Sequence, residues 1–517
     1  MRPDPMEQAA QAGRQLHRFP GGLRLRHNKA ISCELPVARA ELARRLYIPL
    51  PRRPGEEAEV LVSPGQQVRK GDPIAHAGRG GWTHASTSGV VEAVASHPIS
   101  HPSGRDGPCI VIEPDGRDQW TDLHPLEDWR QADPAELRRL IREAGIVGLG
   151  GAVFPTSIKV DEASERGIHT LILNGAECEP YISCDEMLMR EQPDSIVLGA
   201  RILQRAIGAR RVVIAIEDQM GAVRRALQEA LRDSAADNID IVRVTSIYPE
   251  GGEKQLIQVL TGLEVPSGGR PTDLGLLCQN VATATAVARA VAEGKPLVER
   301  IVTVTGNGVR HPRNLLTPIG TPISSIVAQC GGYTPDAARL VLGGPMMGYP
   351  LATDGSPVIK AANCILVMTE DDLRPAQPEM PCIRCGECAR VCPAMLLPQQ
   401  LMWTVRNGLR DEAGELGLAD CIECGCCDFV CPSHISLVAW FRHGKLERQR
   451  HAEERRRADI ARQRFEAREA RLTRIKRERR QRMAEKKRGL ADRRARDEEI
   501  AAAVERARSK TRGGNRT

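Results

Sequence analysis

The chain has 517 residues, more than one hydrophobic core usually serves, so we expect three or four domains. Its net charge of +7 comes from one end: residues 445–517 hold 27 basic and 13 acidic residues, which leaves 46 basic and 53 acidic residues elsewhere. A mildly acidic body argues against a core that binds nucleic acid. No apolar run approaches the roughly 18 residues of a membrane-spanning helix, so we expect a soluble or peripheral protein.

Residues 1–56 form an N-terminal segment in which nothing resembles a secretory signal, and residues 57–116 contain short strand-like runs separated by turns. The pattern V-x-x-G-D-x-I at 68–74, followed by H-A-x-x-S-G-V-V at 84–91, resembles the hammerhead fold of biotinyl and lipoyl carriers. A carrier would present a lysine at the hairpin tip, but residues 77–82 contain none. We therefore expect a structural module instead of a swinging arm.

Residues 134–292 alternate between apolar strand-like runs and amphipathic helices such as 222–231. The strand-like runs lie at 170–173, 211–216 and 240–244. Alternation of this kind predicts an α/β domain with a largely parallel sheet.

Residues 300–334 carry V-T-V-T-G at 302–306 and end in paired glycines, and they resemble a small β-grasp ligand-binding module. A linker from 375 to 381 then leads into a cysteine-rich domain at 375–445. The expected fold class is a multidomain α/β plus β protein with a charged tail at 446–517.

Closely spaced glycines open the stretch G-I-V-G-L-G-G-A-V-F-P-T-S-I-K at 145–159. Gly148, Gly150 and Gly151 would let backbone N–H groups approach phosphate oxygens, and Lys159 would add a positive charge. Taken alone, such a stretch is more often a turn. It also lacks the full G-x-G-x-x-G pattern, so an ordinary Rossmann site is not indicated.

This stretch resembles the glycine loop of the flavoprotein subunit of respiratory complex I, which reads G-R-G-G-A-G-F-P-T-G-x-K. Segments 174–180, 248–256 and 279–283 resemble further segments of that family in the same order. The departures from the family pattern include Leu149, Val153, Ser157 and Ala176. In that family the segments bind FMN with NADH above it, so the resemblance implies an FMN site here and NADH as the substrate.

The positions that this resemblance places around the flavin are Gly148, Gly150, Gly151, Lys159, Asn174, Glu177, Glu253 and Asn280. The carboxylates would contact cofactor hydroxyls or orient the nicotinamide, while the redox chemistry belongs to the cofactors. Without the resemblance, Glu177, Glu179 and Glu253 would be interpreted as solvated or paired surface carboxylates.

Two similar cysteine runs, each followed by proline, have the spacing of two-cluster bacterial ferredoxins. They consist of Cys382, Cys385, Cys388 and Cys392, and of Cys421, Cys424, Cys427 and Cys431. In this signature the fourth cysteine of each run binds the other 4Fe-4S cluster. The prediction is therefore one cluster on Cys382, Cys385, Cys388 and Cys431, and a second on Cys421, Cys424, Cys427 and Cys392.

Alternatives to this prediction are structural zinc sites and a disulfide framework. Zinc sites use two pairs of ligands instead of four cysteines with a trailing proline, and disulfides need an oxidising compartment. A local ambiguity lies in Cys426 and Cys427, where the phase of the first run favours Cys427 as the third ligand.

The tail at 446–517 is rich in Arg, Ala and Glu and has almost no apolar periodicity, which predicts a long solvated helix or disorder. A sharper hypothesis is an electrostatic tether to anionic lipid or to an acidic partner. Nucleic-acid binding is disfavoured because no aromatic side chains interleave with the arginines.

From about residue 19 to residue 445, the chain resembles the RnfC family of the Rnf (Rsx) electron transport complex. Segments 101–104, 177–182, 343–348 and 431–433 support the resemblance. It implies a peripheral subunit on the cytoplasmic face of the bacterial inner membrane, part of a translocase that couples NADH/ferredoxin electron transfer through FMN and two 4Fe-4S clusters to Na⁺ or H⁺ transport. The implied partners are integral membrane subunits, a ferredoxin-like subunit and ferredoxin.

Two other functions remain open at this point. A soluble NADH-dependent cobalamin reductase of the propanediol-utilisation type resembles the same architecture. Alternatively, the α/β domain has lost its flavin and the chain is a non-catalytic iron-sulfur wire or scaffold, a hypothesis motivated by the departures at Val153, Ser157 and Ala176.

Overall fold

The computed structural model describes residues 16–50, 58–78, 81–234, 238–373 and 377–513. The first fifteen residues of the N-terminal segment, the boundary at 51–57, part of the hairpin tip (79–80) and the start of the linker (374–376) lie outside the described residues. The chain falls into two units, one ending at Arg442 and the other beginning at His443.

A four-stranded, fully parallel sheet forms the centre of the α/β domain. Its order is β11 (Ile239–Val244), β10 (Arg211–Glu217), β9 (Thr170–Gly175) and β12 (Leu276–Asn280). The surrounding helices are α3 (Pro134–Glu143), α4 (Thr156–Arg166), α5 (Cys184–Glu191), α6 (Pro193–Ile207), α7 (Gly221–Ser234), α8 (Glu253–Thr261) and α9 (Val281–Ala292). The predicted strands and the helix at 222–231 are all present, and β12 was not predicted.

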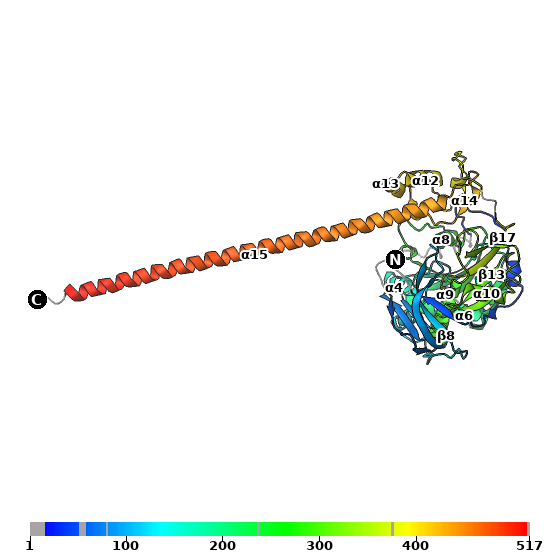
Figure 1. Ribbon diagram of the computed structural model, residues 1–517, viewed down its shortest axis with the longest axis horizontal. Helices are drawn as coiled ribbons and strands as arrows, with labels where there is room; N and C mark the ends of the chain where they lie inside the picture. Colours follow the sequence, from blue (N-terminus) through cyan, green and yellow to red (C-terminus); the bar gives the residue numbers. More distant parts are fainter. Residues whose placement is uncertain (1–15, 51–57, 79–80, 235–237, 374–376, 514–517) are drawn as a thin grey trace. The chain divides into compact units, whose positions relative to one another are not determined.

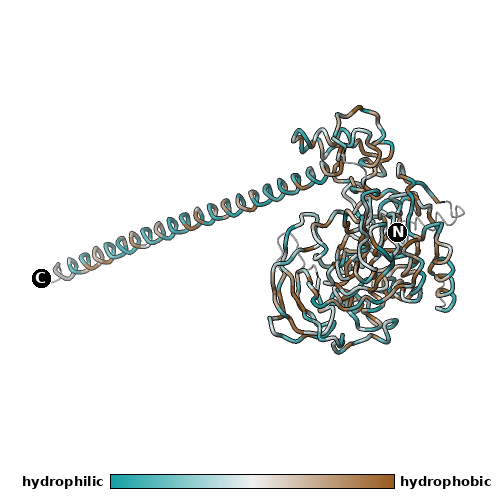
Figure 2. Tube along the Cα trace, turned by 45° about the vertical axis from the view of Figure 1, so that its right-hand side comes forward, coloured by the Kyte–Doolittle hydropathy of each residue, from teal (hydrophilic) through white to brown (hydrophobic). Residues whose placement is uncertain are grey.

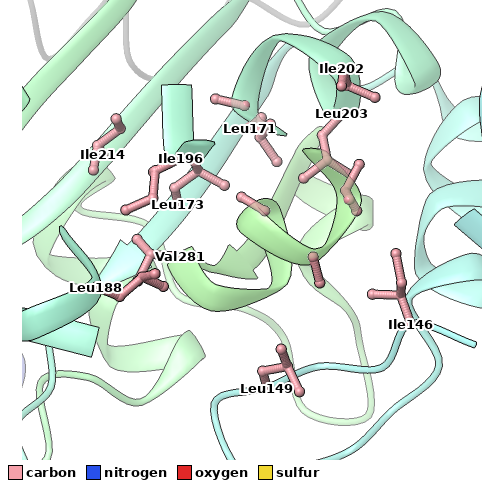
Figure 3. Packing of buried hydrophobic residues seen from close by; sticks show 14 of the residues in the cluster. Ile146, Leu149, Leu171, Leu173, Leu188, Ile196, Ile202, Leu203, Ile214 and Val281 are labelled. Carbon is pink, nitrogen blue, oxygen red and sulfur yellow. The ribbon is translucent and has the colours of Figure 1, made fainter. Parts of the chain in front are cut away.

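Both faces of this sheet are buried, and β9 supplies apolar side chains to each face in turn. Leu171 and Leu173 pack into the larger core, together with residues of α6 and α9, and Figure 3 shows them beside Ile196 and Val281. Ile172 points to the opposite core, which contains residues of α8. Successive side chains of a strand point to opposite faces, so a strand covered on both faces requires a near-continuous apolar run.

Two smaller sheets face each other at residues 46–114. One has the order β2 (Leu46–Pro49), β8 (Asp106–Pro114), β7 (Gly89–Pro98), β4 (Gln67–Val68), and the other β3 (Glu59–Val60), β5 (Pro73–Ala77), β6 (Gly81–His84). Ile48 and Ile110 from the first sheet share a core with Ile74 from the second. The predicted hammerhead region is thus a two-sheet β module that also recruits β2.

A six-stranded mixed sheet follows the α/β domain. Its order is β1 (Ala38–Arg39), β14 (Arg313–Pro318), β13 (Glu299–Thr305), β17 (Cys364–Thr369), β15 (Ala337–Leu342) and β16 (Tyr349–Pro350), and α10 (Ile323–Gln329) packs in its core. The module predicted at 300–334 supplies β13, α10 and β14. The other strands come from the N-terminal segment and from residues up to Thr369.

The cysteine-rich region contains short helices: α11 (Glu387–Arg390), α12 (Pro398–Arg406), α13 (Arg410–Glu415) and α14 (Cys426–Val430). Leu401, Leu418 and Phe441 form the centre of its core. Figure 1 shows α12, α13 and α14 in this part of the chain.

The tail is helical: α15 (Leu437–Gly513) is one continuous helix (Figure 1). Its side chains beyond the first turns are almost all exposed, and hydrophilic residues are interspersed with single apolar ones along its length (Figure 2). Ion pairs one turn apart, such as Glu453 with Arg456 and Arg457, stabilise it modestly. No described helix, this one included, is apolar enough over a sufficient length to cross a membrane.

Candidate functional site

The carboxyl edge of the parallel sheet brings two predicted residues together. The chain runs from β9 to β10 and β11 on one side and then returns to place β12 on the other side of β9. Asn174, one residue before the end of β9, and Asn280, the last residue of β12, are direct partners in register. In open α/β sheets ligands bind at such a switch point, beyond the carboxyl ends of the strands.

The two asparagine side chains hold the loops of this edge in place. The Asn174 amide donates to the Gly251 carbonyl at 2.8 Å, and its oxygen accepts from the Ala176 N–H at 3.0 Å. Asn280 caps α9 by accepting from the Ala282 N–H at 2.8 Å. Both residues therefore organise backbone around the switch point.

The glycine loop rests on the N-terminal end of α9. The Leu149 N–H donates to Thr283 Oγ1 at 3.0 Å, and the Leu149 side chain is anchored in the large core (Figure 3). A Cβ added to Gly150 would lie 3.4 Å from Asn280 Cβ, whereas one added to Gly151, at φ +105°, would meet nothing within 4 Å. Gly150 thus permits the close approach, and Gly151 borders open space.

Val153 keeps the backbone conformation that glycine favours. It occupies the position where the complex I loop has a glycine, and its φ is +51°. A β-branched residue in this region is strained, by about 1–2 kcal/mol. The loop nevertheless closes, with the Val153 N–H donating to the Gly148 carbonyl at 3.2 Å and the Gly148 N–H donating to the Phe154 carbonyl at 2.8 Å. This substitution therefore leaves the loop geometry intact.

The start of α4 fits a phosphate group. This helix follows the glycine loop directly, and no side chain caps its N-terminal end. Thr156 Oγ1, in the first turn, is fully buried and has no hydrogen-bond partner among the residues that the structure describes. Free N–H groups at a helix N-terminus attract anions, and an unpartnered buried hydroxyl is costly unless a ligand satisfies it. The residues present thus fit the phosphate of a flavin mononucleotide.

Lys159 and Glu253 form an ion pair at the same edge. Lys159 Nζ, on the next turn of α4, lies 2.7 Å from Glu253 Oε2, the first residue of α8. Their side chains are 28% and 36% exposed, so a ligand can reach both. The structure thus brings Gly148 and six other predicted residues to one edge of one sheet. The six are Gly150, Gly151, Lys159, Asn174, Glu253 and Asn280.

The eight predicted cluster cysteines line two cavities. One is lined by Cys382, Cys385, Cys388 and Cys431, and the other by Cys392, Cys421, Cys424 and Cys427, with Cys426 beside them. These are the two sets predicted from the ferredoxin signature, in which the fourth cysteine of each run binds the cluster of the other run. None of the sixteen cysteines, all of which lie in described residues, is in a disulfide. Four thiols converging on one cavity fit the ligand set of a 4Fe-4S cluster.

The two runs fold alike. Arg384 and Glu423 occupy equivalent positions and have φ values of +59° and +57°. Met395 and His434, the third residue after each run, both have φ of +52°. Cys426 and Cys427 both line the second cavity, so the preference for Cys427 as the third ligand still rests on the spacing of the run.

Comparison with known families divides the chain in the same way. Residues 17–117 match an RnfC barrel sandwich hybrid domain, 141–289 a Nuo51 FMN-binding domain, 301–350 an SLBB domain, and 381–436 a 4Fe-4S dicluster domain. Most of the chain also matches proteins named as the C component of an ion-translocating oxidoreductase complex. Those of Edwardsiella ictaluri and Pseudomonas aeruginosa are 46% identical over 92% and 89% of this chain, and each match covers 59% of the relative. The protein of Yersinia pestis is 44% identical over 89% of this chain and 74% of its own length.

The chain belongs to the RnfC family of ion-translocating oxidoreductase complexes. It spans about 59% of the length of the first two relatives. Among solved structures, an NAD⁺-reducing [NiFe]-hydrogenase aligns with 62% of this chain and 64% of its own length, at 20% identity and with a TM-score of 0.44. FMN and two 4Fe-4S clusters are the cofactors to which the matched domains correspond.

In this member of the RnfC family, Glu177 is buried beneath the switch point. Its carboxylate accepts from the Asp185 N–H at 3.0 Å and from Cys184 Sγ at 3.3 Å, and thereby holds the start of α5. Lys29 Nζ lies 3.6 Å away. Asp185 accepts from Asn280 Nδ2 at 2.6 Å, which connects Glu177 indirectly to the residues of the switch point.

Burial gives Glu177 a testable pH dependence. Loss of solvation raises the pKa of its carboxyl from 4.5 to about 7, although the Lys29 ammonium opposes the shift. The folded chain therefore holds a proton that the unfolded chain releases, and stability falls as pH rises from 4.5 to about 7. The full effect is on the order of 3 kcal/mol. Thermal unfolding of the α/β domain across this range should show a smaller fall for Glu177→Gln, and parallel curves would contradict the prediction.

Several residues of this site carried no recognisable sequence signal. Lys29 lies 148 positions from Glu177, and Asp185 sits in an ordinary helical stretch. Arg300 is buried in β13 and donates to the Leu149 carbonyl at 3.1 Å, so it supports the glycine loop from the neighbouring sheet. A charged residue in an otherwise apolar strand was the one available hint.

Proposed function

We propose that this chain is the peripheral electron-entry subunit of a membrane-bound complex that couples electron transfer to ion translocation. Its family and its FMN-binding and dicluster domains support the proposal. The main structural observation behind the proposal is the switch point at Asn174 and Asn280, where a glycine loop, an uncapped helix and a lysine converge. Electrons would enter at this edge and leave through the two cysteine cavities.

Each residue set has a role in this proposal. Gly148, Gly150 and Gly151, with the start of α4, would hold the FMN phosphate, and Lys159 would add a positive charge. Glu253 would contact the cofactor or orient the nicotinamide. Flavin supplies the conversion between a two-electron hydride donor and one-electron clusters. Burial of Glu177 favours an indirect role for that residue, through Asp185 and Asn280.

The proposed partners follow from the family. They are integral membrane subunits, a ferredoxin-like subunit and ferredoxin, with docking at the cytoplasmic face of the inner membrane. The exposed, basic α15 would add electrostatic attraction to an anionic membrane surface or an acidic partner.

An anaerobic titration with NADH tests the entry role. The full chain, reconstituted with iron and sulfide, is first assayed for extractable flavin and then followed by absorbance. We expect one FMN per chain and bleaching of the flavin followed by the cluster band. Clusters that bleach only with dithionite, in a chain without flavin, would overturn the proposal in favour of an iron-sulfur wire. Stoichiometric reduction of added cob(III)alamin by NADH would instead favour the soluble cobalamin reductase.

A further inference from the structure

One loop contacts both proposed cofactor sites. Residues 245–252 connect β11 to α8, and the Gly251 carbonyl in this loop accepts the Asn174 amide at the switch point. Tyr248 lies three residues earlier and is only 3% exposed. Its hydroxyl donates to the Cys424 carbonyl at 2.6 Å, and Cys424 lines the second cysteine cavity. The loop therefore spans from the flavin edge to the second cluster.

Apolar side chains make up much of the contact between the second cavity and the α/β domain, and the Glu179 carboxylate lies beside Tyr248. Tyr248, Cys424 and Cys426 form a buried apolar cluster, and Met346 packs against it. A Cβ added to Gly425 would lie 2.9 Å from the Met346 carbonyl oxygen, so the chains are in direct contact there. Met346 is in turn fixed by its N–H, which donates to Glu179 Oε1 at 2.6 Å.

The N-terminal segment also holds the second cavity against the α/β domain. The Gly22 N–H donates to the Val391 carbonyl at 3.0 Å, next to the second-cluster ligand Cys392. The Leu23 N–H donates to the Tyr248 carbonyl at 2.7 Å, and the Tyr248 N–H donates back at 2.9 Å. Three separate segments thus hold the second cavity against the domain that carries the glycine loop.

The first cavity faces solvent instead. Cys382 and Cys385 are exposed, and the side chain of Ile383 between them is 68% exposed. The start of this run is held from within the cysteine-rich region, where the Met380 N–H donates to the Ser433 carbonyl at 2.9 Å. The two cysteine runs are therefore similar in sequence, but the first cavity faces solvent and the second is packed against the α/β domain.

We propose that the cluster on Cys421, Cys424, Cys427 and Cys392 exchanges electrons directly with the flavin, and that Tyr248 positions it and raises its reduction potential. The inference rests on the proposed function. Electron transfer slows steeply with distance, so the cluster packed against the flavin domain is the first acceptor and the exposed cluster is the exit. A hydrogen bond toward the backbone of a ligand stabilises the extra negative charge of the reduced cluster.

The step is balanced without any change in bonding. One electron leaves the reduced flavin, and one electron is added to the second-run cluster, with no proton or group transferred. Passing this electron to the first-run cluster frees the second-run cluster for the other electron of the hydride, and the proton that came with the hydride then leaves the oxidised flavin to solvent.

Tyr248→Phe tests the positioning role, because it removes the hydroxyl and keeps the ring. Redox titration with dithionite and mediators, followed by electron paramagnetic resonance, should show a more negative potential for the second-run cluster and an unchanged first-run cluster. Tyr349→Phe is the matched control, since that hydroxyl donates to the Ser100 carbonyl at 2.8 Å, in a part of the chain that lines neither cavity. Unchanged potentials in Tyr248→Phe, or a shift of the first-run cluster, would overturn the role of Tyr248.

Two further variants test the order of transfer. In stopped-flow experiments with NADH, Cys382→Ser should keep the wild-type rate of electron transfer from flavin to the remaining cluster. Cys421→Ser should slow reduction of its remaining cluster at least tenfold. Wild-type rates in Cys421→Ser, with normal flavin reduction, would overturn the order alone. If NADH leaves a bound flavin oxidised, the proposed function fails and the proposed order of electron transfer fails with it. The redox titration of Tyr248→Phe still tests the role of Tyr248, because it needs only the two clusters.

Discussion

Replacing Cys392 by serine should remove the cluster bound by the second cysteine run and leave the first cluster in place. Cys392 belongs to the first run in sequence, but it lines the cavity formed by Cys421, Cys424 and Cys427. A cubane that loses one of its four thiolate ligands is expected to be lost or strongly perturbed. Electron paramagnetic resonance of the reduced variant should therefore retain the signal of the first-run cluster, and iron content should fall by about half.

The reciprocal variant and a neighbouring cysteine sharpen this result. Cys431→Ser should remove the cluster on Cys382, Cys385 and Cys388, whose cavity Cys431 completes. Cys426→Ser should keep both clusters, because Cys427 has the same spacing within its run as the third ligand of the first run. Loss of the first-run signal in Cys392→Ser would refute the crossed assignment, and loss of the second cluster in Cys426→Ser would transfer the third-ligand role to Cys426.

Placing an aspartate at Gly151 should abolish stable FMN binding. A side chain at this position would enter the open space next to the glycine loop, where the phosphate is proposed to lie. A carboxylate there would repel the phosphate, and like charges in contact cost several kcal/mol. Since each 1.4 kcal/mol is a factor of ten in affinity, retained flavin should fall by at least roughly tenfold. Flavin released from purified wild-type and variant chains by acid provides the measurement.

Gly167→Asp is a matched control for this substitution. Gly167 ends α4 with φ of +69°, and an added Cβ would also meet nothing within 4 Å. Both variants add the same side chain at a position of positive φ, although the φ of +105° at Gly151 lies farther outside the left-handed helical region than the +69° at Gly167. The control lies at the opposite end of α4 from the proposed phosphate, so its flavin content should match the wild type. Equal losses in both variants would show that general destabilisation explains the effect.

The α/β domain was largely predictable because its signals are local. Apolar runs of strand length, separated by amphipathic helices, indicate a parallel sheet without any knowledge of its order. Strand β12 escaped prediction because its five residues include Cys278, Gln279 and Asn280, which interrupt the apolar pattern. Strand β1 has only two residues, and its partner strand β14 lies about 275 positions away in the sequence. No local sequence pattern could therefore predict it.

The sequence alone determined which groups could hold the cofactors. Cysteine spacing fixes how thiols project from a tight loop, and closely spaced glycines fix where backbone can approach a ligand, so both signals can be read along the chain. Tertiary structure decided how these groups face one another. Glu177 is buried and is met by Lys29 from a segment 148 positions away, and Tyr248 contacts Cys424 across 176 positions. Such contacts depend on how whole domains pack, and no spacing within a segment encodes which of two similar cysteine runs becomes buried.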